Sequence, residues 1–298
     1  MNYASLGISL VALLPAILLC IFVYTKDKSE KEPISLVLIL FLSGAAVFFP
    51  SLYAEKFLSS SVDSLFADKM SFSFDGILSY SSEGDRFLHL MLTALVVAVT
   101  EEALKWFLLF FITRKNKNFN YLFDGIVYST FVSMGFAAVE NIRYALIDGW
   151  DTLFFRAVTS VPGHLFFGIF MGYCYTLWNT YRCAEKLEKD LISRGKASVS
   201  KFKHTYVWLI LSFILPIIVH FIYTFTNIYD SSIVTAFFYI FVIVLYILCF
   251  ININHMSDKD ANNNRLAYSL VLKKHLNIES NIDKLLSNRE AKGASTDE

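Results

Sequence analysis

The sequence has few charged residues, and their signs balance. Of 298 residues only 17% are Asp, Glu, Lys or Arg, and the formal net charge is zero. Without excess positive charge the chain lacks the electrostatic attraction to a polyanion, which argues against nucleic acid as a partner. Hydrophobic residues make up 55% of the chain, including 29 Phe and 16 Tyr. This composition is too apolar for a soluble domain of this length.

Several familiar patterns are absent as well. The four cysteines have no paired spacing, which argues against a disulfide framework or a cysteine-based zinc site. No HExxH sequence occurs, so two histidines on one helical turn cannot bind zinc here. No internal repeat of the inverted-transporter kind is visible, and the spans are not broken by paired Gly or Pro.

Long apolar runs are what the sequence does contain. Because ~20 apolar residues span the hydrocarbon core of a bilayer, these runs predict an all-α polytopic membrane protein with about seven transmembrane helices. We expect residues 1–253 to form one helical membrane domain. The apolar segments cover residues 4–24, 34–53, 87–112, 124–147, 153–179, 205–227 and 233–253.

Basic residues predict the orientation. The first apolar segment has no basic residue before it and is followed by Lys26 and Lys28, the reverse of a secretory signal peptide, so we expect a retained span with its N-terminus outside. Alternating spans then place 20 Lys and Arg on one side and three on the other. The positive-inside rule puts the basic side, with the polar tail 254–298, in the cytoplasm. Residues 54–86 become an external loop.

Two adjacent carboxylates lie within the third apolar run. Glu101 and Glu102 follow fourteen residues of the run 87–113, and Lys105 lies on the same helical face as both. On insertion scales each charge at the bilayer centre costs roughly 2.5–3.5 kcal/mol. Alone, this group also fits a structural salt bridge, with Lys105 pairing one carboxylate.

Further polar residues occur at similar depth in the next three segments. The fourth carries Glu140 and Asn141, the fifth carries His164, and the sixth carries His220. Arg143, one turn beyond Glu140, is the expected counter-charge. Each residue alone fits an interhelical hydrogen bond or ion pair. Five ionisable groups at one depth, however, predict a single polar functional site.

At these residues the chain resembles a known family. Glu-Glu-Ala-Leu-Lys at 101–105 resembles the EExxK motif of the PrsW-type intramembrane proteases, within a wider CaaX-protease-like superfamily. Residues 123–146 resemble its FxxxEN motif with Phe136, Glu140 and Asn141. Residues 156–173 and 220–225 resemble its two histidine blocks, with His164 and His220. The similarity covers about 85–230. In the last block Thr224 stands where Asn or Asp is common, so only a hydroxyl is available there.

The resemblance implies a multi-pass protease of a prokaryotic plasma membrane. Its substrates would be other membrane proteins, in some members an anti-sigma factor at the first step of a stress response. Two other classes stay open from the residues alone: an ion- or proton-coupled transporter that uses the carboxylates as a relay, and a non-catalytic membrane scaffold. The absence of repeats argues against the transporter.

Two chemical schemes fit the predicted catalytic residues. In a metal-free scheme, Glu101 or Glu102 activates water, Lys105 anchors the other carboxylate, and the two histidines polarise the carbonyl, with Asn141 as a further donor. In a zinc scheme, a carboxylate and two histidines leave one coordination position open. The predicted zinc ligands are His164, His220 and Glu140. We prefer the metal-free scheme, and zinc stays the alternative.

Overall fold

The computed structural model describes residues 3–72, 78–196, 202 and 205–276. Its described part is almost entirely helical, with one short hairpin, as the composition predicted. The elements in chain order are α1 (Tyr3–Lys26), α2 (Ile34–Leu65), the 3-10 helix η1 (Ala67–Lys69), β1 (Met70–Phe72), β2 (Leu78–Tyr80), α3 (Glu83–Thr113), α4 (Asp124–Val158), α5 (Ser160–Ser193), α6 (Tyr206–Ile228), α7 (Ser232–Asp258) and α8 (Asn263–Leu276).

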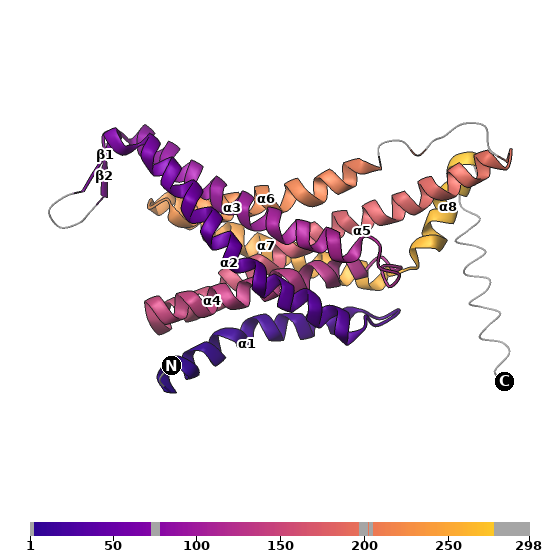
Figure 1. Cartoon of the computed structure of the whole chain (residues 1–298), viewed down its shortest axis with the longest axis horizontal. Helices are drawn as coiled ribbons and strands as arrows, with labels where there is room; N and C mark the ends of the chain where they lie inside the picture. Colours follow the sequence, from indigo (N-terminus) through magenta and orange to yellow (C-terminus); the bar gives the residue numbers. More distant parts are fainter. Residues whose placement is uncertain (1–2, 73–77, 197–201, 203–204, 277–298) are drawn as a thin grey trace.

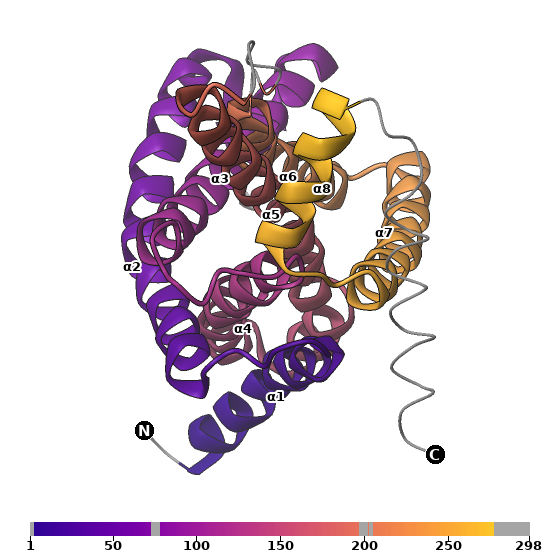
Figure 2. The same ribbon diagram turned by 90° about the vertical axis from the view of Figure 1, so that its right-hand side faces the viewer.

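The helices run back and forth along the long axis, so that the hairpin lies at one end and α8 at the other (Figure 1). Seen along that axis, α4 lies inside the group formed by α1, α2 and α5 (Figure 2), and it packs against all three. Every residue from Phe123 to Ala138 is buried. A helix that is covered on all sides forms the centre of a bundle, and α4 therefore positions its neighbours.

Small residues let α4 and α5 approach each other closely. A Cβ added at Gly172 would collide with the carbonyl oxygen of Gly125 on α4, and one at Gly168 would lie 2.7 Å from Oγ of Ser133. Gly168 and Gly172 form a Gly-xxx-Gly spacing on α5, a pattern typical of closely packed membrane helices. This close spacing brings the polar residues of α4 and α5 within hydrogen-bonding distance.

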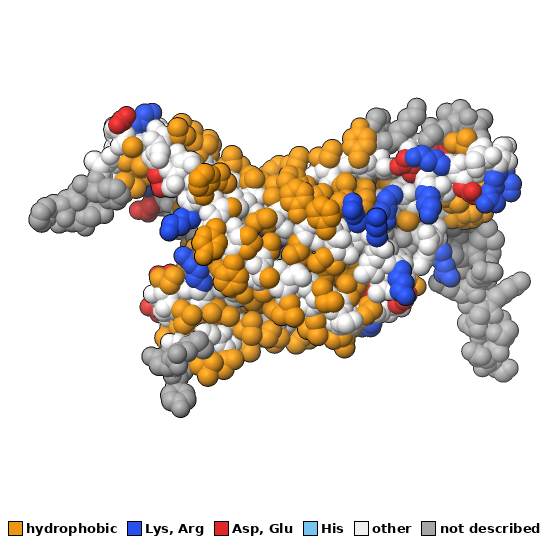
Figure 3. Space-filling view, viewed as in Figure 1, with side chains coloured by type: hydrophobic (Ala, Val, Ile, Leu, Met, Phe, Trp, Pro, Cys, Tyr) orange, Lys and Arg blue, Asp and Glu red, His pale blue; other side chains and the backbone are white. Residues whose placement is uncertain are grey.

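The surface is that of a membrane protein. Five helical stretches of the described chain are long and apolar enough to cross a bilayer: Ser5–Lys26, Ile34–Leu65, Asp124–Ser193, Tyr206–Ile228 and Ser232–Asp258. The third of these contains both α4 and α5. Figure 3 shows hydrophobic side chains over the middle of the molecule and charged side chains gathered toward its two ends. An exposed apolar belt of this kind is stable only against lipid.

Several boundaries differ from the apolar segments. Helix α2 continues to Leu65, so residues 54–65 of the predicted loop are helical. His89 of α3 holds the connection between α2 and α3 in place. Its ring nitrogens lie 2.9 Å from Asp63 of α2 and 2.9 Å from the Tyr80 hydroxyl of β2. In the predicted tail, residues 263–276 form α8, while residues 277–298 lie outside the described part. Polar residues can extend a helix once its apolar part is packed.

Helix α4 is also longer than its apolar segment. It continues to Val158, through a non-helical Gly149 with φ 85° and ψ −161°. The residues that we assigned to the start of the fifth span thus form the last part of α4, and α5 begins at Ser160. His164 is consequently the fifth residue of α5, nearer its start than the sequence indicated.

Candidate functional site

Helix α3 supplies two buried carboxylates and the cation between them. Nζ of Lys105 donates to Oε2 of Glu101 at 3.0 Å and to Oε1 of Glu102 at 2.8 Å. Glu102 and Lys105 are completely buried, and Glu101 is 3% exposed. Spacings of three and four residues place all three side chains on one helical face. Lys105 therefore pairs both carboxylates, rather than the single one that we predicted.

His220 joins this group from α6. Its Nδ1 lies 2.9 Å from Oε1 of Glu102, so the imidazole donates to the carboxylate through this nitrogen. Phe167 of α5 stacks on the ring, with centroids 4.4 Å apart. No hydrogen bond from the described residues engages Nε2 of His220. In the neutral ring this nitrogen keeps a free lone pair.

His164 connects the α3 group to α4. Nζ of Lys105 donates to Nδ1 of His164 at 3.1 Å, which requires the proton of the neutral ring to be on Nε2. That nitrogen donates to Oε2 of Glu140 at 2.9 Å. The five ionisable residues predicted at one depth thus form one continuous network, with Lys105 at its centre.

The counter-charge of Glu140 is Arg156, not Arg143 as predicted. Nη2 of Arg156 donates to Oε2 of Glu140 at 2.6 Å, and no ion pair of the described residues involves Arg143. We overlooked Arg156 in the sequence. The sequence could have identified Arg156, because it is a charged residue within the apolar residues 152–161. The same kind of position identified Glu101 and Glu102.

Two supporting residues lie outside the network. Asn141 faces the opposite side of α4, where its Nδ2 donates to the carbonyl oxygen of Ala12 on α1 at 2.8 Å. Consecutive residues on a helix point about 100° apart, so Asn141 cannot share the direction of Glu140. Thr224, one turn beyond His220, is half-buried, and among the described residues its hydroxyl makes no hydrogen bond to the network.

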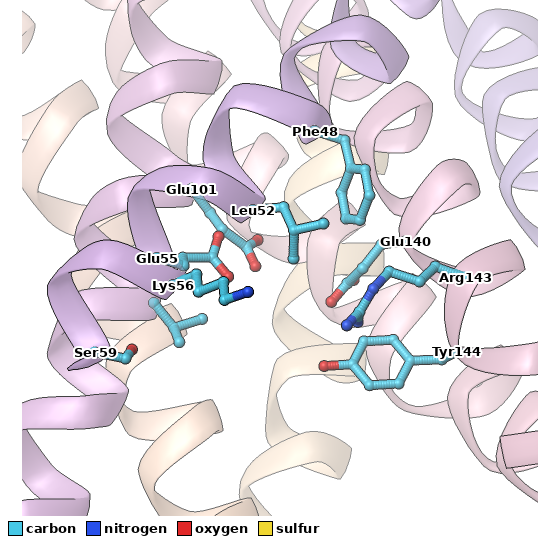
Figure 4. Close-up of a pocket in the computed structure, with 10 residues that line it drawn as sticks. Phe48, Leu52, Glu55, Lys56, Ser59, Glu101, Glu140, Arg143 and Tyr144 are labelled. Carbon is cyan, nitrogen blue, oxygen red and sulfur yellow. The ribbon is translucent and has the colours of Figure 1, made fainter. Parts of the chain in front are cut away.

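One cavity reaches the network. It has a volume of about 260 Å³ and lies between α2, α3 and α4 (Figure 4). Of the network, Glu101 and Glu140 line it, whereas Glu102, His164 and His220 lie behind them. The full lining is Phe48, Leu52, Glu55, Lys56, Ser59, Val97, Glu101, Glu140, Arg143 and Tyr144. Water in this cavity can therefore reach Glu101 and Glu140 directly.

The residues that fit a metal ion differ from the predicted set. One ligand atom each of Glu101, Glu102 and His220 lies within 4.8 Å of the others. Oε2 of Glu102 is buried and has no hydrogen-bond partner. Two carboxylates and an imidazole with a free nitrogen are suitable ligands for a catalytic zinc. His164 and Glu140, which we predicted as ligands, are not part of this group; they contact each other, and they also contact Lys105 and Arg156.

The sequence matches a known family over most of its length. Residues 32–251 match the sequence model of the PrsW family, described as intramembrane metalloproteases. The match extends beyond residues 85–230, to which the motifs had confined the resemblance, and it includes α2. No solved structure matches the chain.

Several curated relatives carry the name of this family. The chain is 32% identical to "Protease PrsW" of Geobacillus kaustophilus over 70% of its length and 74% of the relative. It is 31% identical to the Oceanobacillus iheyensis protein of that name, over 74% of this chain and 82% of the relative. A Clostridioides difficile protein of that name is 26% identical over 81% and 87% of the two chains.

Proposed function

Because the chain belongs to the PrsW family of intramembrane metalloproteases, we propose that Glu101, Glu102 and His220 form its catalytic centre for peptide-bond hydrolysis. The observation that carries this proposal is the continuous buried network from His220 to Glu140 beside a cavity. Buried ionisable groups that converge from four helices are rarely explained by packing alone. Family membership does not favour the transporter or the scaffold.

Glu101 is the general base in this proposal. It is the only member of the α3 carboxylate pair that lines the cavity, and there it can accept a proton from an attacking water. Lys105 holds its carboxylate in position at 3.0 Å. Glu102 has a different task, because its buried carboxylate orients His220 from behind.

Glu140 and His164 complete the opposite wall of the site. Glu140, ionised as the partner of Arg156, lines the cavity opposite Glu101, and the proton that Glu101 takes from water is the one that Glu101 passes to the leaving amine. His164 and Arg156 both donate to its Oε2, which fixes the carboxylate in one orientation. Lys105 and His164 thereby connect the two carboxylates that contact the cavity, and their positions depend on each other.

A metal ion fits the same centre. With an ion bound, Glu101, Glu102 and His220 would serve as its ligands in place of the roles given above, and the ion would act as a Lewis acid on the scissile carbonyl. Lys105 contacts both carboxylate ligands, so it would neutralise part of their charge and orient them. The protein residues alone account for the positioning and proton transfer described above.

We infer that α1 to α7 are the seven spans, with the N-terminus outside and α8 at the cytoplasmic surface. The 20 to 3 split of basic residues supports this orientation, and so do the lengths of these helices, 23 to 35 residues. The substrates are then membrane proteins of a bacterial plasma membrane. A single-pass anti-sigma factor is one substrate of this class.

The test is cleavage by purified protein in liposomes. The wild type is incubated with a panel of single-pass bacterial membrane proteins, and products are followed by mass spectrometry. We expect cleavage of at least one substrate, and Glu101→Gln should reduce kcat by roughly a thousandfold because an amide cannot accept the proton from water.

The matched control is Glu185→Gln, since Glu185 lies far along α5 and pairs only with Lys189 and Thr205 in the described structure. It should cleave like the wild type. Robust cleavage by Glu101→Gln would move the base to Glu140. Full activity of a Glu101→Gln, Glu102→Gln double variant would disprove the proposed centre.

A further inference from the structure

The cavity beside Glu101 contains two cations that have no ion-pair partner. Lys56 of α2 and Arg143 of α4 both line it, and they point toward the gap from opposite walls (Figure 4). No carboxylate of the described residues lies within 4.0 Å of either side chain. Arg143 is half-buried, with its guanidinium 5.1 Å from the ring of Tyr144. Charges in a partly buried position are normally paired.

The acidic residues of the cavity are already engaged. Glu101 pairs with Lys105, and Glu140 pairs with Arg156 and His164. Glu55 accepts a hydrogen bond from Ser51 at 2.6 Å, and it is the only carboxylate of the lining without a cation partner. Lys56 and Arg143 are therefore the two cations of the lining that no carboxylate engages, and they are free to bind an incoming anion.

We propose that this cavity is a substrate subsite that binds an acidic side chain, with Arg143 as the residue that recognises its carboxylate. A guanidinium binds a carboxylate through two parallel hydrogen bonds, which gives direction as well as charge. Lys56, which is exposed at the rim, attracts the same group. This assignment rests on the proposed function, because it requires a protein substrate at Glu101.

The size of the cavity fits this ligand. Its volume of about 260 Å³ is below the range of roughly 300–1,000 Å³ typical of whole small-molecule sites. It can hold one side chain together with a few waters. Because Glu101 and Glu140 line the same cavity, a substrate anchored at Arg143 places a nearby peptide bond at these two carboxylates. The acidic side chain thus selects which bond is cut.

The first test needs no substrate. A cysteine is introduced at Ser59, which lines the cavity, and at Ser60, which is exposed and outside it. Each is labelled in liposomes with an anionic and a cationic methanethiosulfonate. We expect the anionic-to-cationic rate ratio at position 59 to exceed that at position 60 by roughly tenfold, a difference of about 1.4 kcal/mol.

Arg143→Gln should remove most of this preference, and Arg143→Lys should retain it. If Arg143→Gln fails to elute as a folded protein, Lys56→Gln tests the same labelling preference, because it removes the second cation that lines the cavity. A ratio that is equal at the two positions, or that neither substitution changes, overturns the proposal whether or not the protein cleaves any substrate.

The second test identifies the occupant. In a cleaved substrate, each acidic residue near the cut is replaced by Lys, and one such replacement should lower kcat/KM at least tenfold. Arg143→Glu should restore cleavage of that Lys substrate and lose cleavage of the original. If position 59 shows the charge preference but Arg143→Glu does not exchange the substrate specificity, the site binds another anion, such as a lipid phosphate. That outcome overturns the substrate assignment. If the wild type cuts nothing while the labelling preference holds, the proposed function fails instead.

Discussion

Arg156 and Glu140 belong to the same helix, yet they form an ion pair at 2.6 Å across sixteen residues. In a straight α-helix that separation is about 24 Å. The pair is possible because α4 changes direction at Gly149, whose φ of 85° is outside the helical region. The last part of α4 therefore turns back and places Arg156 beside the network. One glycine thus determines the position of a charge at the candidate active site.

Gly149→Ala should disturb this arrangement. The backbone region of Gly149 is essentially restricted to glycine and costs a residue with a Cβ roughly 1–3 kcal/mol, and relief of that strain would move Arg156 away from Glu140. We expect a lower unfolding temperature and reduced cleavage, measured by differential scanning fluorimetry and by product formation. Gly84→Ala is the control, because a Cβ at Gly84, in the first turn of α3, would make only an ordinary contact at 3.7 Å with Oγ of Ser82. An unchanged Gly149→Ala variant would mean that the bend does not position Arg156.

The two histidines should differ in metal binding. His220 belongs to the group whose ligand atoms lie within 4.8 Å, whereas both nitrogens of His164 are occupied by Lys105 and Glu140. We expect His220→Ala to lose bound metal and His164→Ala to retain it, measured by inductively coupled plasma mass spectrometry. Loss of metal from His164→Ala alone would restore the ligand set predicted from the sequence. Full activity after strong chelation, without stoichiometric metal, would support the metal-free scheme.

Stability should fall as the pH rises from 5 to 7.5. Asp27 and Glu32 lie between α1 and α2 and are buried. Burial raises the pKa of Asp27 from 3.8 to about 6, with the neighbouring Asp260 adding to the rise and Lys31 opposing it. Burial likewise raises the pKa of Glu32 from 4.5 to about 7. The folded state therefore binds more protons than the unfolded state in this range, and raising the pH removes that stabilisation.

An Asp27→Asn, Glu32→Gln double variant tests the pH effect. Its unfolding temperature should fall less with rising pH over this range than that of the wild type, which loses on the order of 2 kcal/mol. Asp68→Asn is the control, because Asp68 is exposed on η1. It should follow the wild type. A double variant with the wild-type pH dependence would assign the effect to other groups.

Labelling in intact cells should separate the two sides of the membrane. A cysteine at Lys189, near the end of α5, should be protected from a membrane-impermeant maleimide, because we place that end in the cytoplasm. A cysteine at Ser64, exposed near the end of α2, should react. The reverse pattern would invert the proposed orientation, and reaction at both positions would contradict the odd number of spans, α3, α4 and α5, that we place between them.

Much of the candidate site was predictable from residue type and depth. Glu101, Glu102 and Lys105 share a face because helical periodicity places residues three and four apart together. The chemistry of a polar group in lipid likewise identified Glu140, His164 and His220 without tertiary information. The same periodicity failed for Arg143, which is one turn from Glu140 but lines the cavity instead. Local spacing shows which residues can pair, and the bend at Gly149 provided a better partner.

The sequence by itself determined the class of the protein, because apolar length and the cost of a buried charge are properties of the residues and the bilayer. It also determined the family, through ordered motifs. Only the tertiary structure decided which polar atoms meet. Asn141 follows Glu140 directly yet contacts Ala12 on α1, and Glu55, which belonged to a predicted loop, lines the cavity. Such contacts depend on helix rotation, helix length and one reversal of direction, and these are set by packing between segments far apart in the chain.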